Sequence, residues 1–172
     1  EALCRERVRP FARIIVFNGE ASAAYNRIQL SGLLAGETDE AALTLQQDNW
    51  FRDNGIEVFT GEPVVSVNRE DKTVTTTTGR VQRYTHLVFA TGSRPAKPGL
   101  PGQDLPGVMT FRDLDDARTL IDAARKHRRA VVIGGGFLGL EAAEGLRQRG
   151  MAVTLLPRSS HLLNRQLDEI GG

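Results

Sequence analysis

The chain has 172 residues, which is enough for one ordinary domain or for parts of two. Its composition, 40% hydrophobic and 25% charged with 18 glycines, is typical of a soluble α/β protein. The formal net charge of +1 excludes a general electrostatic attraction to nucleic acid or to an anionic membrane. No apolar run approaches the roughly 20 residues that span a bilayer, so we expect a cytoplasmic protein without a nucleic-acid or membrane partner.

Cysteine and histidine usage limits the chemistry further. Cys4 is the only cysteine, which excludes an intrachain disulfide, a CxxC redox pair and a thiolate metal cluster in this chain. No metal site is predicted, because the histidines lie far apart without metal-ligand spacing: His86, His127 and His161. Residues 1–7 have the character of a helix end without an initiator methionine, so we expect an internal fragment of a longer protein.

The first third of the chain predicts strands separated by helical segments. In chain order these are a strand at 13–17, an apolar helical segment at 28–34, a helix at 39–54 and a strand at 56–59. The β-branched run at 13–17 has the composition of a strand buried on both faces. Thr38 or Asp39 can cap the helix that follows Gly36, and Asn54-Gly55 can end it.

The middle of the chain predicts a β-meander and a crossing. Residues 63–84 are rich in Val and Thr, with turn signals between three short runs: 64–68, 73–78 and 81–84. A buried strand is predicted at 87–90, ending abruptly at Thr91-Gly92. Residues 93–102 are dense in Pro and Gly, which indicates a rigid crossing between domains. Asp113 is expected to cap a helix with one apolar face.

The stretch VVIGGGFLGLE, residues 131–141, carries a GxGxxG pattern on Gly134, Gly136 and Gly139. The first glycine permits a tight turn, the second lets the backbone approach a pyrophosphate, and the third lets the helix pack close to the strand. The helix that starts there would point free N–H groups at the phosphates. Because an apolar strand precedes the loop and an amphipathic helix and a strand at 151–156 follow it, we predict a nucleotide-binding β-α-β unit.

One part of this pattern is missing. An acidic residue about 20 positions on normally accepts hydrogen bonds from the ribose hydroxyls. Pro157 stands at that place, followed by Arg158. Arg158 could meet a 2′-phosphate, which would favour NADP, or it could be a solvated loop cation, so the choice of cofactor stays open.

These features together resemble the two-dinucleotide-fold flavoprotein reductases of the pyridine nucleotide-disulfide oxidoreductase superfamily. The resemblance implies an α/β, three-layer, FAD/NAD(P)-binding Rossmann-like fold with a β-meander insertion, and partial copies of two nucleotide-binding domains. Residues 1–107 would belong to the FAD domain, whose own glycine loop would lie upstream of Glu1. Residues 108–172 would belong to the NAD(P)H domain.

A closer resemblance is to the large subunit of assimilatory NAD(P)H-dependent nitrite reductase. It covers nearly the whole chain and is carried by five segments: YNRIQLS with LAGE at 25–37, NGI at 54–56, LGLEAA at 138–143, GLRQRGM at 145–151 and RQLD at 165–168. This family implies FAD and NAD(P)H as cofactors here. Sirohaem and an iron–sulfur cluster would belong to a region outside this chain.

The resemblance also implies site residues. For FAD these are the backbone of Thr91 and Gly92 at the strand end, Asn26 and Arg27 along the cofactor, and a backbone contact from Val64 to adenine. The alternatives are that Arg27 forms a surface salt bridge and that Val64 is simply core.

Further residues are assigned to the nicotinamide cofactor. The predicted NAD(P) contacts are Gly134, Gly136, Phe137, Leu138, Gly139 and Arg158. By the family pattern, Phe137 would gate the nicotinamide pocket and Glu141 would lie near the nicotinamide. Both would position the ring and not act as acid–base catalysts, because hydride transfer needs positioning more than proton transfer. A glutamate in the second turn of a buried helix is costly unless it is paired, which favours a functional place for Glu141.

Three functional hypotheses follow. In the first, the chain accepts hydride from NAD(P)H onto FAD and passes electrons towards sirohaem for nitrite reduction to ammonia, during nitrate assimilation. In the second, it is a rubredoxin- or ferredoxin-type reductase that serves a separate redox protein. In the third, it is a nucleotide-binding module without turnover. A small subunit or a redox protein is a possible partner, and the sequence does not decide the oligomeric state.

Overall fold

The computed structural model describes residues 11–172, so Cys4 and the predicted helix end at 1–7 lie outside the described residues. The chain divides into two compact units. The first contains residues up to Tyr25 together with Thr44–Thr91, and the second contains Asn26–Leu43 together with Gly92–Gly172. The domain boundary predicted between residues 107 and 108 stays a prediction. Within the described residues, no helix is both long enough and apolar enough to cross a membrane.

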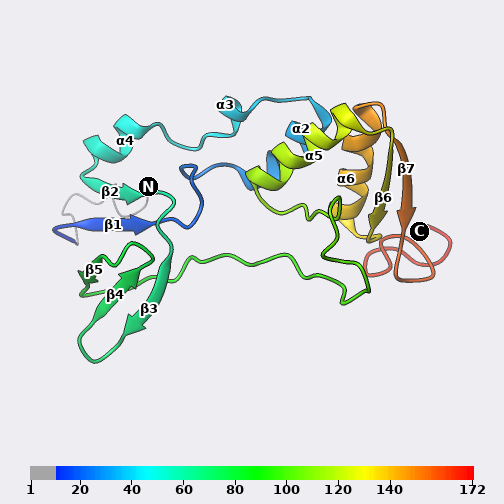
Figure 1. The fold of residues 1–172 in the computed structure, drawn as a ribbon. Helices are drawn as coiled ribbons and strands as arrows, with labels where there is room; N and C mark the ends of the chain where they lie inside the picture. The colour runs from blue at the N-terminus through cyan, green and yellow to red at the C-terminus, as the bar shows by residue number, and fades with distance from the viewer. Residues whose placement is uncertain (1–10) are drawn as a thin grey trace. The chain divides into compact units, whose positions relative to one another are not determined.

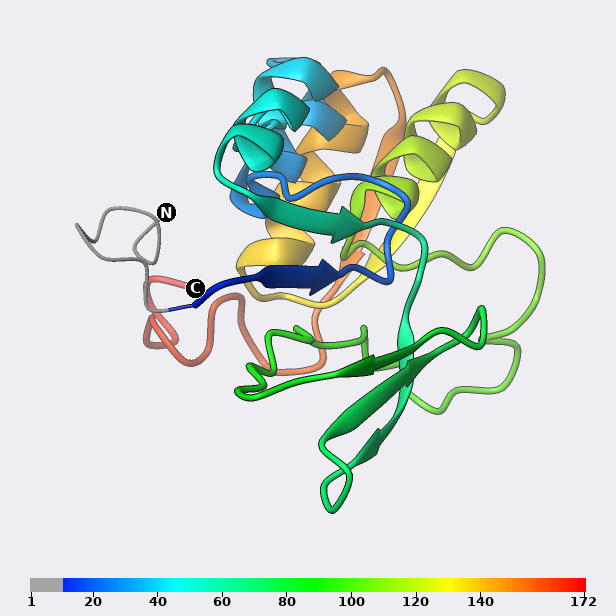
Figure 2. The same ribbon diagram turned by 90° about the vertical axis from the view of Figure 1, so that its left-hand side faces the viewer.

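The first unit contains a parallel pair of strands. Strand β1 (Ile14–Phe17) pairs with β2 (Ile56–Phe59) in register from Ile14 opposite Ile56 to Phe17 opposite Phe59, and the two run in the same direction in Figure 2. Helix α4 (Asp48–Asp53) precedes β2 and contacts it. Both strands were predicted. The expectation that β1 is buried on both faces is wrong, because the side chain of Val16 is 41% exposed.

The β-meander is the second sheet of this unit. Strands β3 (Val64–Asn68), β4 (Thr73–Thr76) and β5 (Val81–Arg83) form an antiparallel sheet in that order, as predicted. The run of threonines fits the alternation of a strand, because Val74 and Thr76 are buried while Thr73 and Thr75 are half-buried on the opposite face.

A buried carboxylate links the two sheets of the first unit. Glu62, only 7% exposed, lies just before β3, and its Oε1 accepts hydrogen bonds from Thr76 Oγ1 at 2.8 Å, Thr78 Oγ1 at 2.7 Å and Arg80 Nε at 2.9 Å. The Arg80 guanidinium in turn lies 4.2 Å from the centroid of the Phe59 ring on β2. These contacts attach the end of the meander to the parallel strands.

Two sequence predictions are wrong in this region. The single helix expected at 39–54 is divided into α3 (Glu40–Leu43), capped by Asp39, and α4. The reason is non-local pairing: Leu43 O accepts from Asn26 N at 2.8 Å and Leu45 N donates to Ala24 O at 3.2 Å, so these groups are withdrawn from a continuous helix.

The buried strand expected at 87–90 is not formed. These residues pair with no strand in the part of the chain that the structure describes, and Val88 and Phe89 are 81% and 70% exposed. An apolar run becomes a buried strand only if another strand supplies hydrogen bonds along its edge and a further layer covers its faces.

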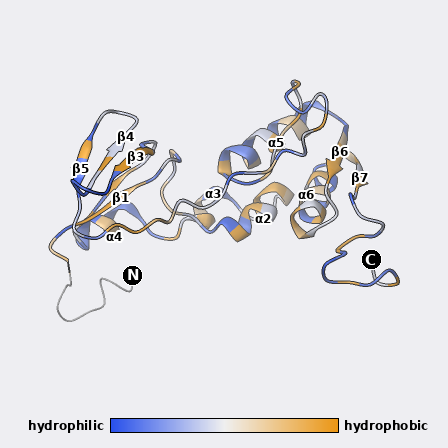
Figure 3. Cartoon of the chain, turned by 90° about the horizontal axis from the view of Figure 1, so that it is seen from below, coloured by the Kyte–Doolittle hydropathy of each residue, from blue (hydrophilic) through white to orange (hydrophobic). Residues whose placement is uncertain are grey.

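The second unit is built around one β-α-β element. Strand β6 (Arg129–Ile133), helix α6 (Phe137–Gln148) and strand β7 (Ala152–Leu156) follow each other, and the two strands pair in parallel from Arg129 opposite Ala152 to Ile133 opposite Leu156. Helices α5 (Leu114–Lys126) and α6 lie beside these strands (Figure 1). Asp113 caps α5 through its side chain, as predicted. In Figure 3, α5 alternates between polar and apolar colours along its length.

The core of this unit lies between the helices and one face of the sheet. The buried cluster comprises Leu34, Ala124, Ala142, Leu146 and Met151, with Ala130, Val132 and Val153 of the strands packed against it. The opposite face of the same strands is exposed at Val131, Ile133 and Leu156. Period-two alternation explains both faces, because successive side chains of a strand point in opposite directions.

A segment far upstream in the sequence completes this core. Helix α2 (Leu30–Ala35), which follows the 3₁₀ turn η1 (Arg27–Gln29), packs on α6 and ends at Gly36, whose φ of +87° lies in the left-handed region. A Cβ at Gly145 would lie 2.9 Å from Leu34 Cγ, so glycine permits the close approach of the two helices. Arg149 donates to the carbonyl oxygens of Leu33 and Leu34 and thereby satisfies the end of α2.

The Glu62 cluster yields a prediction about pH and stability. We expect Glu62→Gln to lower the stability of the chain at neutral pH, because hydrogen bonds from Thr78, then Thr76, then Arg80 hold the pKa of this carboxyl below its ordinary value. A lowered pKa means that the contribution is present above the ordinary pKa and is lost as the pH falls through the folded-state value. The difference in urea midpoint between parent and variant should therefore shrink in acid. Glu70→Gln, in the exposed turn between β3 and β4, is the control, and equal losses in the two variants would contradict the assignment.

Candidate functional site: the glycine loop and the groove beside helix α6

The glycine loop has the backbone geometry that its sequence predicts. Gly134 has a φ of +138°, a value that favours glycine, and its N–H donates to Leu156 O at 2.9 Å, which fixes the loop to the end of β7. A Cβ at Gly139 would lie 2.1 Å from Gly134 O, so a glycine is required for α6 to start this close to the strand. The roles predicted for the first and third glycines are therefore explained by contacts within the chain.

The middle glycine faces open space. A Cβ at Gly136 would meet nothing within 4 Å, and the φ of −88° is available to any residue. Gly136 is also the N-cap of α6 and makes no side-chain cap, while Phe137 and Leu138 in the first turn are 59% and 47% exposed. An exposed helix start with uncapped N–H groups is suited to an anion, so the residues present fit the diphosphate of a dinucleotide.

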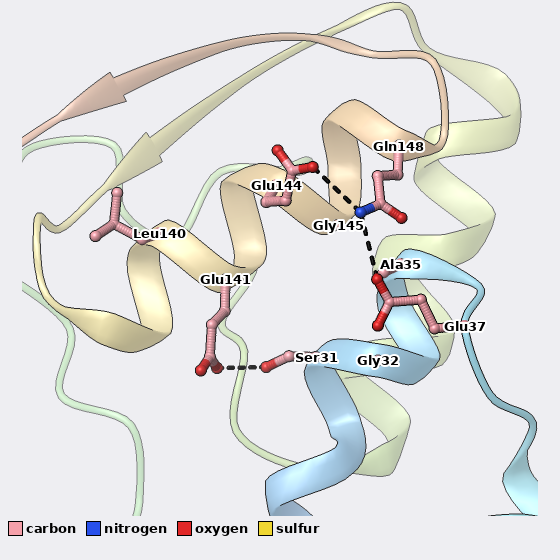
Figure 4. Close-up of a pocket in the computed structure, with 9 residues that line it drawn as sticks. All are labelled: Ser31, Gly32, Ala35, Glu37, Leu140, Glu141, Glu144, Gly145 and Gln148. Carbon is pink, nitrogen blue, oxygen red and sulfur yellow. Dashed lines mark hydrogen bonds between the residues drawn. The ribbon is translucent and has the colours of Figure 1, made fainter.

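Glu141 lies one turn further along α6 and is exposed, so the expectation of a costly charge on a buried helix is wrong. Its Oε2 accepts a hydrogen bond of 2.5 Å from Ser31 Oγ on α2. Figure 4 shows the two side chains pointing toward one another between the helices. No local sequence pattern points to Ser31, since its partner Glu141 is 110 positions away along the chain.

Ser31 and Glu141 belong to a groove between α2 and α6. Its lining residues are Ser31, Gly32, Ala35, Glu37, Leu140, Glu141, Glu144, Gly145 and Gln148 (Figure 4). Gln148 Nε2 donates to Glu144 at 3.1 Å and to Glu37 at 3.4 Å across it. Hydrogen bonds from Arg147 and then Gln148 lower the pKa of Glu144 to about 2, so this carboxylate is anionic at neutral pH.

Arg158 is the second residue after β7 and is exposed. Because Gly134 is hydrogen-bonded to Leu156, the end of β7 lies beside the glycine loop, and Arg158 shares this region with Gly134, Gly136, Phe137, Leu138 and Gly139. The predicted NAD(P) residues thus form one cluster at the carboxyl end of the parallel pair, where dinucleotide-binding folds bind their ligand.

The predicted FAD residues are distributed over both units. Val64 and Thr91 lie in the first, and Asn26, Arg27 and Gly92 in the second. Asn26 Oδ1 accepts from Ile28 N, and Arg27 Nη1 donates to Arg112 O at 3.0 Å. Val64 is 39% exposed at the start of β3, which contradicts a purely core role. A Cβ at Gly92 would meet nothing within 4 Å, so its φ of +64° explains the glycine here.

Glu20, just after the end of β1, is a further candidate site residue that the sequence-based prediction did not include. Glu20 lies three positions after β1 and its carboxylate accepts a hydrogen bond of 2.7 Å from Tyr25. An acid just past the carboxyl end of a parallel strand is the position from which ribose hydroxyls are bound in dinucleotide folds. The signal was available in the sequence as an acid soon after the apolar run at 13–17.

The family model for pyridine nucleotide-disulphide oxidoreductases matches residues 5–171. The chain belongs to this family. The predicted α/β dinucleotide-binding fold, the oxidoreductase class and the cofactors FAD and NAD(P)H are thereby confirmed.

A curated relative narrows the comparison. The nitrite reductase [NAD(P)H] of Bacillus subtilis is 44% identical over 160 residues, covering 93% of this chain and 20% of the relative. The predicted resemblance to nitrite reductase large subunits is thereby confirmed. This chain corresponds to about a fifth of that protein's length.

Solved structures agree on the fold. A ferredoxin reductase from Rhodopseudomonas palustris matches with a TM-score of 0.88 and 30% identity, over 98% of this chain and 42% of its own. An engineered water-forming NADPH oxidase bound to NADPH matches with a TM-score of 0.84 and 26% identity, over 92% and 37%. It is a mutant of the NADH oxidase of Lactobacillus brevis, with Gly replaced by Ala, three consecutive residues Asp, Ala and Met replaced by Ala, Arg and Ser, and a Pro replaced by Arg.

Gly136 and Gly139 of the glycine loop provide a matched pair of variants. We expect Gly136→Ala to leave thermal stability nearly unchanged, because its methyl group meets nothing, but to weaken NAD(P)H binding about tenfold or more by obstructing the backbone approach of the diphosphate. Gly139→Ala should instead lower the melting temperature by several degrees, roughly the effect of 1–3 kcal/mol of overpacking. Thermal unfolding without nucleotide and a fluorescence titration with NAD(P)H measure the two effects. Unchanged nucleotide affinity in Gly136→Ala would contradict the location of the site.

Proposed function

We propose that the chain is the electron-entry part of a nitrite reductase. In this proposal it accepts hydride from NAD(P)H onto FAD and passes electrons towards a sirohaem and iron–sulfur centre, where nitrite is reduced to ammonia. The observation that carries the proposal is the 44% identity to a nitrite reductase over 93% of this chain, combined with a glycine loop whose geometry suits a dinucleotide.

The start of α6 supplies the nicotinamide cofactor site. Its uncapped N–H groups and the positive end of the helix dipole attract the diphosphate, and Gly136 leaves room for the backbone to approach it. Phe137, exposed in the first turn, supplies an apolar surface against which an aromatic ring can stack.

Glu141 is the group proposed to orient the nicotinamide. It lies four residues after Phe137 and therefore on the same side of α6. The hydrogen bond from Ser31 restricts its carboxylate to one orientation, so an amide donor of a bound ring would meet a pre-positioned acceptor.

For FAD we propose the ends of the strands in the first unit and the residues that follow them. Glu20 would accept hydrogen bonds from the ribose hydroxyls, Val64 would contact adenine through its backbone, and Thr91 with Gly92 would approach the cofactor through main-chain atoms. Asn26 and Arg27 remain assigned to FAD by the family resemblance. When bound, FAD takes up a hydride and can release electrons singly, which suits an iron–sulfur or haem acceptor.

The second candidate is a reductase that serves a separate redox protein. It is favoured by the match to a ferredoxin reductase over 98% of this chain. The two candidates share the flavin chemistry and differ in the acceptor, which lies beyond this segment in the first case and on a partner protein in the second.

The engineered NADPH oxidase provides a comparison for the choice between NADPH and NADH. The spacing between its first two substituted positions equals that between Gly139 and Pro157 here. If the substituted glycine is taken to correspond to Gly139, Pro157 stands at the substituted aspartate, and Arg158 and Ser159 match the arginine and serine that were introduced. On the same register Asn164 stands where the second arginine was introduced, so that position does not match. Gly139 differs, because the engineered protein has alanine there.

Flavin reduction tests the function directly. Full-length protein containing this sequence should be yellow, should lose its flavin absorbance when NADPH or NADH is added without oxygen, and should regain it on addition of nitrite. Recovery with reduction of an added ferredoxin and none with nitrite would select the second candidate. Colourless protein that oxidises neither nucleotide with an artificial acceptor would overturn both.

The Ser31–Glu141 pair gives a finer test. We expect Ser31→Ala to slow flavin reduction several-fold, because Glu141 loses the hydrogen bond that orients it, a loss of about 1 kcal/mol. Ser31→Thr keeps the hydroxyl and should keep most of the rate. Rapid-mixing measurement of flavin reduction at saturating nucleotide separates this effect from binding. Equal rates in parent and Ser31→Ala would exclude a positioning role for the pair.

A further inference from the structure

The segment after β7 returns to the glycine loop. Leu156 O accepts from Gly134 N at 2.9 Å, and Leu163 N donates to Gly135 O at 2.8 Å, so both ends of the intervening segment are joined to the loop. Pro157 packs so closely that a Cβ at Gly135 would lie 2.8 Å from Pro157 Cβ. Residues 157–163 therefore form a loop held beside the place proposed for the dinucleotide, which we call the β7 loop.

The β7 loop has no acidic residue. Its sequence is Pro-Arg-Ser-Ser-His-Leu-Leu, and the first acid after β7 is Asp168. A carboxylate at the end of β7 would accept hydrogen bonds from the 2′- and 3′-hydroxyls of an adenosine ribose and would repel a 2′-phosphate. Because Pro157 has neither charge nor a hydrogen-bonding side chain, this barrier to a phosphorylated ribose is missing.

Arg158 provides the opposite charge at the adjacent position. Its side chain is exposed and, among residues 11–172, no acidic group forms an ion pair with it. A guanidinium is suited to a phosphate because it donates two hydrogen bonds in a fork that matches the phosphate oxygens. Its neighbours are fixed by the loop itself: Ser159 Oγ donates to His161 O at 2.7 Å, and Ser160 Oγ lies 3.1 Å from His161 Nδ1.

We propose that the chain selects NADPH over NADH, and that Arg158 binds the 2′-phosphate of the adenosine ribose. This inference rests on the proposed function only in requiring that a nicotinamide dinucleotide binds at the glycine loop. The ring nitrogens of His161 on the same loop are already paired, Nδ1 with Ser160 Oγ at 3.1 Å and Nε2 with Leu167 O at 3.2 Å, so Arg158 is the group assigned to the phosphate. A charge-assisted pair of this kind corresponds to a preference of about tenfold to a hundredfold.

The test uses full-length protein and two readouts. The first is kcat/KM for reduction of the bound flavin by NADPH and by NADH, where the parent should prefer NADPH. Arg158→Gln should lower kcat/KM for NADPH about tenfold to a hundredfold and leave the value for NADH nearly unchanged. Arg129→Gln, at the opposite end of the sheet, is the matched control and should change neither. Pro157→Asp, made in the parent protein, should lower kcat/KM for NADPH and raise kcat/KM for NADH.

The second readout does not depend on turnover. Adenosine 2′,5′-bisphosphate should bind the parent more tightly than adenosine 5′-monophosphate by calorimetry, and Arg158→Gln should remove the difference. Parent protein that prefers NADH, that binds the two adenosine nucleotides equally, or that loses activity with both cofactors equally in Arg158→Gln would overturn the inference. Protein that does not reduce its flavin but still discriminates the two adenosine nucleotides would overturn the proposed function and leave the selection of a 2′-phosphate supported.

Discussion

The contact between helix α6 and the glycine loop is the constraint on which the second unit depends. The 2.1 Å that would separate a Cβ at Gly139 from Gly134 O means that the helix begins as close to β6 as a backbone permits. This position leaves the helix start uncapped and exposed at the carboxyl end of the sheet. It also directs the apolar face of α6 onto Val132 and Val153 of the strands. The packing of α6 and the geometry of the proposed dinucleotide site therefore follow from one close approach.

The same helix connects parts of the chain that are remote in sequence. Gly145 lacks a side chain and so lets Leu34 of α2 pack against α6. Arg149 donates hydrogen bonds to carbonyl oxygens at the end of α2. Glu141 accepts a hydrogen bond from the hydroxyl of Ser31. Arg118 of α5 pairs with Glu40 of α3 through two hydrogen bonds, so α3 is joined to the same unit. Residues 26–43 thus belong structurally with the β-α-β element, and through Ser31 they reach the carboxylate proposed to orient the nicotinamide.

The residues that follow β1 and β7 differ in charge, although each strand belongs to a parallel pair. Glu20 follows β1 and is held by Tyr25, whereas Pro157 and Arg158 follow β7 and no acid occurs before Asp168. An acid suits an unmodified ribose and a cation suits a phosphorylated one. This difference in charge agrees with the proposed binding of FAD near the end of β1 and of NADPH near the end of β7.

The sequence by itself determined the elements whose signals are local: the glycine loop, the β-α-β unit around it, the Val/Thr-rich meander and the Asp113 cap of α5. These depend on periodicity and on residues within a few positions of one another. Only the tertiary structure decided the break in the helix at Leu43–Leu45, the unpaired state of residues 87–90, the exposure of Val131 and Ile133, and the pairing of Ser31 with Glu141. Each of these is set by whether a distant segment supplies a hydrogen-bond partner or a covering surface, and such long-range pairings leave no periodic trace in a single sequence.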